Sequence, residues 1–324
     1  MSGFIIQRLL QAVIVMAVMS VIVFAGIYSI GNPLEILLPP EATQDVRERT
    51  IARFGLDRPV VEQYFYYIRN LLQGDLGRSY IYNEPVLQLI SGRLPATIEL
   101  VLVSVLGALF VGVPLGMLAG YRPEALSSRI IMTVSILGFS VPTFWVGLIL
   151  ILTFAVELGW LPSGGRGDTA ELFGTAWSFL TLNGWSHLAL PAINLALFKL
   201  AIMIRLARAG TREVMLGDTV KFARAAGLSE WTIMSRHVLK LISIPIVTVF
   251  GLELGSTLAF AVVTETIFSW PGVGKLIIDS IKNLDRPVMM AYLMLTAGLF
   301  VTINLVVDLV YALLDPRLRR GRAA

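Results

Sequence analysis

The chain has 324 residues, of which 56% are hydrophobic and only 15% charged, with a mean hydropathy of +0.76 and a formal net charge of +4. Soluble domains carry about 25% charged residues, so an apolar excess this large requires a lipid bilayer around it. The basic residues are spread over loops, which argues against nucleic acid as a partner. The absence of cysteine excludes disulfides and thiolate ligands, and the two histidines lie in different loops, so we expect no metal site and no cofactor.

Six segments are long and apolar enough to span a membrane, since a spanning helix needs about 20 mostly apolar residues. They lie near 9–30, 97–119, 131–156, 187–207, 241–264 and 288–314. The first segment is too long for the apolar region of a secretory signal, and no small-residue cleavage site follows it. The sequence therefore predicts an all-α, polytopic membrane protein with six transmembrane helices.

Lysine and arginine in short loops predict the orientation of such a chain. The loops after the second and fourth spans and the C-terminal end are basic, whereas the opposite short loops carry few basic residues. The basic residues of the first set are Arg122, Arg129, Arg208, Arg212, Lys221, Arg224, Arg236, Lys240, Arg317, Arg319, Arg320 and Arg322. We therefore expect both termini to be cytoplasmic and the long loop at about 31–96 to lie outside.

That outer loop carries its own helix signals. The run VVEQYFYYIRNLLQ at 60–73 has apolar residues at helical spacing and follows Pro59, a favourable residue at a helix start. Gly74 and Gly77 then interrupt the pattern. We expect one or two helices that cap the outer mouth of the protein.

Small residues recur every fourth position in the second and fifth spans. They are Gly112, Gly116 and Gly120, and then Gly251, Gly255 and Ala259. This spacing lets two helix backbones approach closely in a membrane, either within the chain or at a subunit or gate interface. Prolines within or at the ends of spans are expected to kink or end helices; they are Pro114, Pro142, Pro191 and Pro245.

Three ionisable residues, Lys199, Glu253 and Asp308, fall inside apolar spans, where charge is costly and often functional. Lys199 and Glu253 each lie roughly 18 Å along their helices from opposite membrane faces, at about 1.5 Å per residue. Both are therefore near the middle of a core about 30 Å thick. We expect a structural ion pair, with a cavity-lining site for a charged solute as the alternative. Asp308 is nearer the inner face and is expected to make a packing or capping contact.

The segment from Lys221 to Lys240 is polar and basic, and it lies between two strongly apolar spans. Its composition is consistent with a short helix that docks on a cytosolic partner, and equally with an ordinary amphipathic connector. The run WPGVGKL at 270–276 is not a phosphate-binding loop, because Ser269 and Leu276 occupy the places of its first glycine and its Ser/Thr. Nothing in the sequence assembles a catalytic set of residues, so we expect this chain not to be an enzyme.

Several runs of residues occur together in one order along nearly the whole chain. They are GLDRPVVEQY at 55–64, GDLGRS at 74–79, RLPATIEL at 93–100, VPTFWVGLILI at 141–151, VELGWLPSGG at 156–165, the 221–240 segment, VVTETIFSWPGVG at 262–274 and NLVVDLVYALLDPRLRR at 304–320. Together they resemble the first permease subunit of dipeptide and oligopeptide ABC importers, the DppB/OppB type. The match is specific for this subfamily and weak on substrate.

The resemblance implies a type I ABC-importer permease fold with a large extracytoplasmic loop after the first helix, in the inner membrane of a bacterial cell. Residues 1–95 would form an N-terminal transmembrane helix and an extracytoplasmic cap, and residues 96–320 the permease core, with a coupling helix at about 217–236. The implied partners are a homologous second permease (DppC/OppC-like), two cytoplasmic ATPases that hydrolyse the ATP, and an extracytoplasmic solute-binding protein that delivers di- or oligopeptides.

The 221–240 segment resembles the EAA loop of such permeases, whose helix sits in a groove of the ATPase. The residues expected to couple to the ATPases are Lys221, Ala223, Arg224, Gly227, Leu228 and His237. Lys221 stands where the general pattern has a glutamate, and the later proline of that pattern is missing at Lys240. Asn32 also replaces the usual aspartate after the first span.

Two alternatives remain open. The first is a secondary transporter driven by an ion gradient, which would require inverted repeats and several ion-coordinating groups inside the membrane. The second is the same ABC family with a different cargo, such as a nickel chelate, glutathione or an oligosaccharide.

Overall fold

The structure is a computed structural model of the whole chain that describes residues 2–29, 38, 43–54 and 57–314. The chain forms two compact units. Unit 1 comprises Met1–Pro95 and Pro271–Val301, and unit 2 comprises Ala96–Trp270 and Thr302–Ala324. Unit 1 thus combines the N-terminal part of the chain with a later segment.

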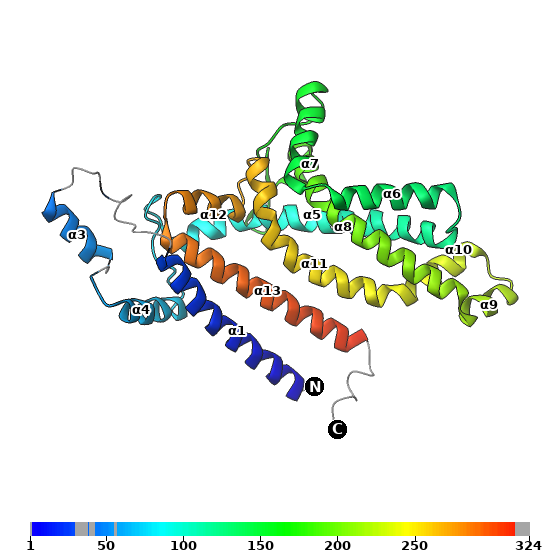
Figure 1. Cartoon of the computed structure of the whole chain (residues 1–324), viewed down its shortest axis with the longest axis horizontal. Coiled ribbons are helices and arrows are strands. Elements are labelled where there is room, and N and C mark those ends of the chain that lie inside the picture. Colours follow the sequence, from blue (N-terminus) through cyan, green and yellow to red (C-terminus); the bar gives the residue numbers. More distant parts are fainter. Residues whose placement is uncertain (1, 30–37, 39–42, 55–56, 315–324) are drawn as a thin grey trace. The chain divides into compact units, whose positions relative to one another are not determined.

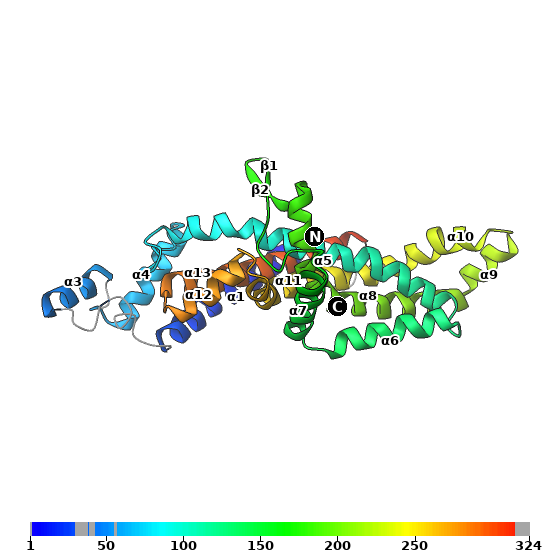
Figure 2. The ribbon, with the colours of Figure 1, turned by 90° about the horizontal axis from the view of Figure 1, so that it is seen from above.

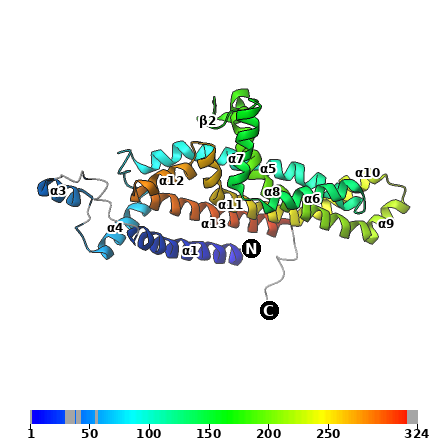
Figure 3. The same ribbon diagram turned by 45° about the horizontal axis from the view of Figure 1, so that its top comes forward.

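Unit 1 is built from helices. They are α1 (Ser2–Ser29), α3 (Gln44–Phe54), α4 (Val60–Leu72), α12 (Val273–Lys282), the first part of α5 (Val86–Tyr121) and the larger part of α13 (Arg286–Leu314). Helix α4 corresponds closely to the outer helix predicted at 60–73. The first part of α13 runs alongside α1 (Figures 1 and 3), and Gly298 faces Met16 across this contact.

Hydrogen bonds and aromatic contacts hold α1 to α4. Tyr28 Oη donates to Gln63 Oε1 at 2.6 Å, and the ring of Phe24 lies 5.3 Å from that of Tyr64. The GDLGRS loop is fastened to the segment before α13, because Asp285, fully buried, accepts from the hydroxyl of Ser79 and from the backbone N–H of Tyr80 at 3.1 Å. The GDLGRS run, one of the motifs that carry the resemblance, therefore has a structural role within unit 1.

Unit 2 contains the rest of α5 and most of the long helices. Its other elements are α6 (Leu126–Ser140), α7 (Thr143–Leu150), the π-helical η1 (Ile151–Glu157), β1 (Ala170–Leu172), β2 (Thr175–Trp177), the 3-10 turn η2 (Ser178–Leu180), α8 (Leu182–Leu216), α9 (Asp218–Ala225), α10 (Glu230–Thr232), the π-helical η3 (Ile233–Val238) and α11 (Leu239–Ile267). Helix α8 packs against both α6 and α11 (Figure 1).

The described residues contain five helices that are long and apolar enough to cross a membrane, and a sixth span if one bent pair is counted. The five are Ile6–Ser29, Val86–Tyr121, Leu182–Leu216, Glu230–Ile267 and Arg286–Val307, and the bent pair is Leu126–Gly138 with Thr143–Glu157. The all-α polytopic fold predicted from the sequence is confirmed.

The third predicted span is not one straight helix. Its two halves meet at 105°, and the chain is extended at Val141 and Pro142, with ψ angles of 135° and 133°. Proline disfavours helical geometry in the residue before it and removes a backbone donor, so the helix ends there. Pro191 and Pro245, in contrast, lie inside continuous helices.

A short antiparallel hairpin, β1–β2, follows the broken span and was not predicted (Figure 2). Its strands are only three residues long, and Phe173 and Gly174 turn the chain with φ angles of 53° and 72°. The signal in the sequence is a single glycine between short mixed runs, too weak to favour strands over a loop.

The glycine stripe in α5 packs against α8 of the same chain. A Cβ on Gly112 would lie 2.8 Å from the Cβ of Met203, and one on Gly120 would lie 2.7 Å from the carbonyl oxygen of Arg208. A Cβ on Gly116 would overlap the carbonyl oxygen of Ile204. Of the two roles open for this stripe, the described contacts are those of packing within the chain, which lets α5 and α8 approach closely.

Substitution at Gly116 tests this packing. Gly116→Ala forces a methyl group into backbone atoms that cannot move aside, and overpacking of this kind costs about 1–3 kcal/mol. We expect a lower apparent melting temperature for the detergent-solubilised chain. Gly107→Ala on the same helix is the control, because its added methyl meets nothing within 4 Å and removes a helix-weakening glycine. Equal melting temperatures for the two variants would contradict the close α5–α8 contact.

Candidate functional site: the α9–η3 loop and the buried ion pair

The polar segment between α8 and α11 folds into three short helical elements, α9, α10 and η3. They lie beyond the C-terminal end of α8, at one end of unit 2 (Figure 2). The segment is therefore an ordered structure with its own helices, as the composition of the 221–240 run suggested. It has two faces with opposite character.

The inner face is apolar and belongs to the core of unit 2. Val220, Ile233 and Val238 are fully buried, and they pack with residues of α5, α8 and α11 in one hydrophobic cluster. Ala223 is in the same cluster and only 3% exposed. The side chain of Ala223 therefore faces its own chain, where a small residue lets α9 lie close to the core, and its expected part in coupling stays a prediction.

The turn after α9 depends on Gly227. Its φ angle is +80°, the left-handed region that glycine adopts without strain. The N–H of Leu228 donates to the carbonyl of Ala223 at 3.1 Å and that of Gly227 to Arg224 at 2.9 Å, which together form a Schellman motif. Nothing lies within 4 Å of the position of a Cβ on Gly227. The glycine therefore serves the turn and not a close approach to another backbone.

An ion pair fixes α10 relative to α9. Arg224 donates from Nε to Glu230 Oε1 at 2.7 Å and from its terminal nitrogen to Oε2 at 3.2 Å. The hydrogen bond from Arg224 holds the pKa of Glu230 below its ordinary value of 4.5. Because the lowered pKa belongs to the folded chain, the pair is intact at neutral pH and is lost only as the pH falls through that lowered value. Two-point contact also sets the orientation of the two side chains.

The face of the loop that points away from the core of unit 2 carries the remaining residues that were expected to couple to the ATPases. Lys221 is exposed and bonds to Asp218 at 2.9 Å, while Leu228 is 40% exposed and His237 is half-buried. Two bulky aromatic residues that were not singled out dominate this face. Phe222 is 79% exposed and Trp231 is 80% exposed. Their signal in the sequence is the presence of large aromatic side chains in an otherwise polar run.

The second candidate is the buried ion pair between α8 and α11. The ammonium of Lys199 contacts Glu253 Oε2, and these side chains are only 6% and 17% exposed. Lys199 Nζ also donates to Ser256 Oγ at 3.2 Å, which in turn donates to the carboxylate of Glu253 at 3.2 Å. Each charge is thus paired and hydrogen-bonded, as a charge in a low-dielectric environment must be. For Asp308, the structure describes the helix but not the side chain.

Two further carboxylates are buried at the opposite end of unit 2 from α9. Glu99 is 1% exposed and accepts from Arg166 Nε at 2.7 Å and from the N–H and hydroxyl of Ser178 at 2.9 and 2.6 Å. Glu265 is fully buried and accepts from Thr97 Oγ1 at 2.5 Å. These residues were not predicted as site residues, although they lie in motifs that carry the resemblance.

The same region brings three of the sequence motifs together. Trp270, also fully buried, donates from Nε1 to the carbonyl of Ala96 at 2.8 Å. The N–H of Gly165 donates to the carbonyl of Phe268 at 2.9 Å. RLPATIEL, VELGWLPSGG and VVTETIFSWPGVG are therefore one hydrogen-bonded cluster in space. Within the part of the chain that the structure describes, no three His, Asp or Glu side chains are grouped to hold a metal ion.

The chain is thus a helical membrane protein with paired charges inside its spans and an ordered polar loop at one end of unit 2. Comparison with known proteins identifies its family. Residues 112–320 match the family model described as binding-protein-dependent transport system inner membrane component, and residues 1–101 match the model of the N-terminal part of such membrane components. The chain belongs to this family, and it is a multi-pass integral inner-membrane protein, the permease component of an ABC importer.

Individual relatives agree along the full length. The chain is 39% identical to the "Di/tripeptide transport system permease protein DppB" of Pseudomonas aeruginosa (strain UCBPP-PA14), over 99% of this chain and 100% of that protein. It is 36% identical to the "Glutathione transport system permease protein GsiC" of Escherichia coli O6:H1, over 98% and 99%. These matches confirm the resemblance to the DppB/OppB type.

The fold is also found in a solved structure. A chain of the MetNI methionine ABC transporter, in an inward-facing conformation, superposes with a TM-score of 0.54 over 68% of this chain and 93% of that chain. The identity is 16%, so this similarity concerns the fold alone. It confirms the ABC-importer permease fold.

A double-mutant cycle tests the Lys199–Glu253 pair. Lys199→Met alone leaves the carboxylate of Glu253 without its cation, and breaking a buried pair costs about 3–5 kcal/mol. We expect a clear loss of apparent thermal stability in each of Lys199→Met and Glu253→Gln. The double variant should be more stable than the sum of the two losses predicts. If the losses simply add, the two side chains do not interact in the membrane.

Proposed function

We propose that this chain is the peptide-conducting permease of an ATP-driven importer. In this proposal it pairs with a homologous second permease, two ATPases bind on the cytoplasmic side, and an extracytoplasmic binding protein delivers the cargo. Residues 1–95 supply a transmembrane helix and an outer cap, and residues 96–320 form the permease core. The printed names of the relatives support a peptide cargo: one transports di- and tripeptides and another glutathione, which is itself a tripeptide.

The α9–η3 loop carries the proposal of ATPase coupling. Its buried face packs against α8 and α11 in one hydrophobic cluster. A displacement of the loop by the ATPases would therefore act directly on these two long helices. Its free face presents Phe222 and Trp231, and exposed aromatic residues of this size are typical of binding hot spots. One face of the loop is thus packed against its own chain, and the other presents exposed aromatic side chains that could bind a partner. ATP binding would draw the ATPases together, and the loop would move α8 and α11 between inward- and outward-open states.

This coupling is reciprocal. If closure of the ATPases changes the conformation of the permease, a loaded binding protein on the outer side must bias the ATPases by the same free energy. The residues that we propose for the link are the exposed members of the loop. They are Lys221, Phe222, Arg224, Leu228 and Trp231, together with the half-buried His237, and Gly227 forms the turn between them.

Removal of the two aromatic side chains tests the docking surface. Phe222→Ala combined with Trp231→Ala should weaken co-purification of the ATPases by roughly thirtyfold or more, since a hot spot contributes at least about 2 kcal/mol. Peptide uptake should fall, while the chain stays inserted at normal abundance because neither side chain is in the core. Phe173→Ala is the control, as Phe173 is 97% exposed on the β1–β2 hairpin. Unchanged ATPase association in the double variant would refute docking through this face.

The proposed orientation has its own test. The chain has no native cysteine, so single cysteines report their side of the membrane without background. We expect Gln44→Cys to react with a membrane-impermeant maleimide in cells with a permeabilised outer membrane, and Ala225→Cys to react only after the inner membrane is opened. Both positions are exposed in the folded chain. The reverse pattern would place the α9–η3 loop outside and separate it from any ATPase.

A further inference from the structure

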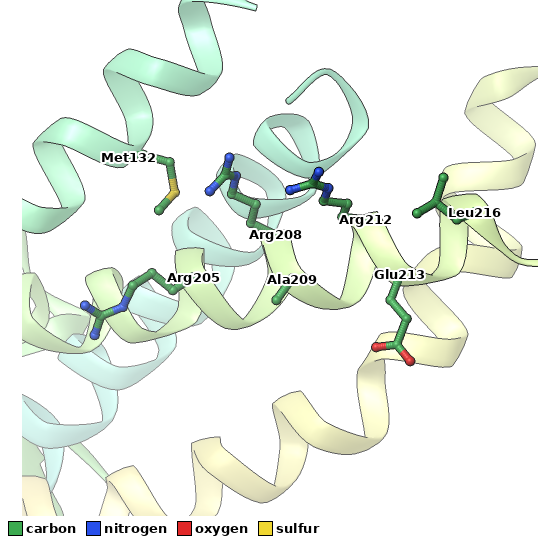
Figure 4. Close-up of a pocket in the computed structure, with 7 residues that line it drawn as sticks. All are labelled: Met132, Arg205, Arg208, Ala209, Arg212, Glu213 and Leu216. Carbon is green, nitrogen blue, oxygen red and sulfur yellow. The ribbon is translucent and has the colours of Figure 1, made fainter. Parts of the chain in front are cut away.

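A basic pocket lies between α8 and α6, close to the C-terminal end of α8. Its volume is about 680 Å³, and its lining residues are Met132, Arg205, Arg208, Ala209, Arg212, Glu213 and Leu216. Arg205, Arg208 and Arg212 are spaced three and four residues apart, so they share one face of α8. Figure 4 shows Arg208 and Arg212 directed to the side where Met132 of α6 lies, whereas Glu213 is directed away from them. The pocket is therefore strongly cationic.

The charge of this pocket is incompletely compensated within the described chain. The Nε of Arg208 is buried and has no hydrogen-bond acceptor among the described residues. A buried donor without an acceptor costs about 1–3 kcal/mol, and more when it belongs to a charged group. Arg208 and Arg212 also repel each other as like charges one helical turn apart. An anion with several acceptor oxygens between the two guanidinium groups would relieve this repulsion.

The place of the pocket along α8 indicates what supplies that anion. Helix α8 is one of the candidate spans, Leu182–Leu216, and its arginines all lie in the last third of it. Charged residues are costly in the middle of a membrane, so we infer that this end of α8 lies at the membrane surface. The opposite wall is Met132, and Ile136, one turn further along the same face of α6, is an apolar side chain that is 52% exposed. A cationic pocket followed by an exposed apolar track matches a molecule with an anionic head and a hydrocarbon tail. Basic pockets between helices at the cytoplasmic face bind phospholipid head groups.

We propose that Arg208 and Arg212 bind the phosphate of an anionic phospholipid from the cytoplasmic leaflet, with the acyl chain lying along α6 past Met132 and Ile136. Guanidinium groups form paired hydrogen bonds with phosphate oxygens, which makes arginine well suited to this ligand. The bound lipid would hold α6 against the end of α8 that leads directly into α9. Lipid composition would thereby influence the helix from which the α9–η3 loop extends.

Native mass spectrometry of the delipidated full chain tests this assignment, with phosphatidylglycerol and phosphatidylethanolamine added separately. We expect the chain to retain phosphatidylglycerol preferentially. Each arginine near the membrane surface contributes a factor of roughly five, so Arg208→Gln with Arg212→Gln should weaken phosphatidylglycerol binding roughly 25-fold. Arg236→Gln, an exposed arginine of η3 outside the pocket, is the matched control and should leave binding unchanged. Arg208→Lys with Arg212→Lys keeps the charge and should retain most of the preference.

Several outcomes would overturn the proposal. Equal retention of the two lipids by the wild-type chain would do so without any variant, and so would a glutamine double variant that binds phosphatidylglycerol like the wild type. Inorganic phosphate gives a further arm: if millimolar phosphate protects the chain against heating in an Arg208-dependent manner and phosphatidylglycerol does not, the pocket takes a free anion. If lipid binding is unaffected but the double variant loses its ATPases, the pocket is a protein contact.

Discussion

Inside a membrane no water is available to polar groups, and this constraint governs the arrangement of unit 2. Two pairs of buried charges described there are partnered within the chain: Lys199 with Glu253, and Glu99 with Arg166. Glu265 accepts from Thr97 in the same way. These pairings join segments that are far apart in the sequence, so they determine which helices are neighbours. Removing one member of a buried ion pair would leave the other charge unpaired in a low-dielectric interior, which costs several kcal/mol.

The same contacts explain how an event at one end of unit 2 can reach the other. The carboxylates at the α5–α11 end tie the segment after the broken span to α5 and α11, and the Lys199–Glu253 pair joins α8 to α11 further along. Close packing at Gly112, Gly116 and Gly120 also holds α5 against α8. The α9–η3 loop then extends this packed assembly through Val220 and Ile233. The loop is thus packed onto α5, α8 and α11, and this packing supports the proposed transmission from an ATPase.

Much of this was predictable from the sequence, because hydropathy and charge act locally. Five spans followed from the length of the apolar segments alone. The rise per residue of a helix placed Lys199 and Glu253 at the same depth in the membrane, which predicted that they could pair. A kink or helix end at Pro142 was expected, and the structure has the helix end there. The β1–β2 hairpin was missed, because its strands of three residues carry too short a pattern to favour strands over a loop. The burial of Ala223 could not be predicted, because the sequence of a short amphipathic helix does not reveal which face meets its own chain. Asn32 lies outside the described residues.

The central claim is that this chain conducts peptides in an importer powered by ATP. Reconstitution in proteoliposomes with the second permease, the two ATPases and the binding protein tests it most directly. Uptake of a labelled tripeptide into the vesicles should require ATP on the side of the α9–η3 loop and binding protein on the other side, and should persist when ion gradients are collapsed. Uptake that continues without ATP and stops when the ion gradient is removed would contradict the account and identify a secondary transporter.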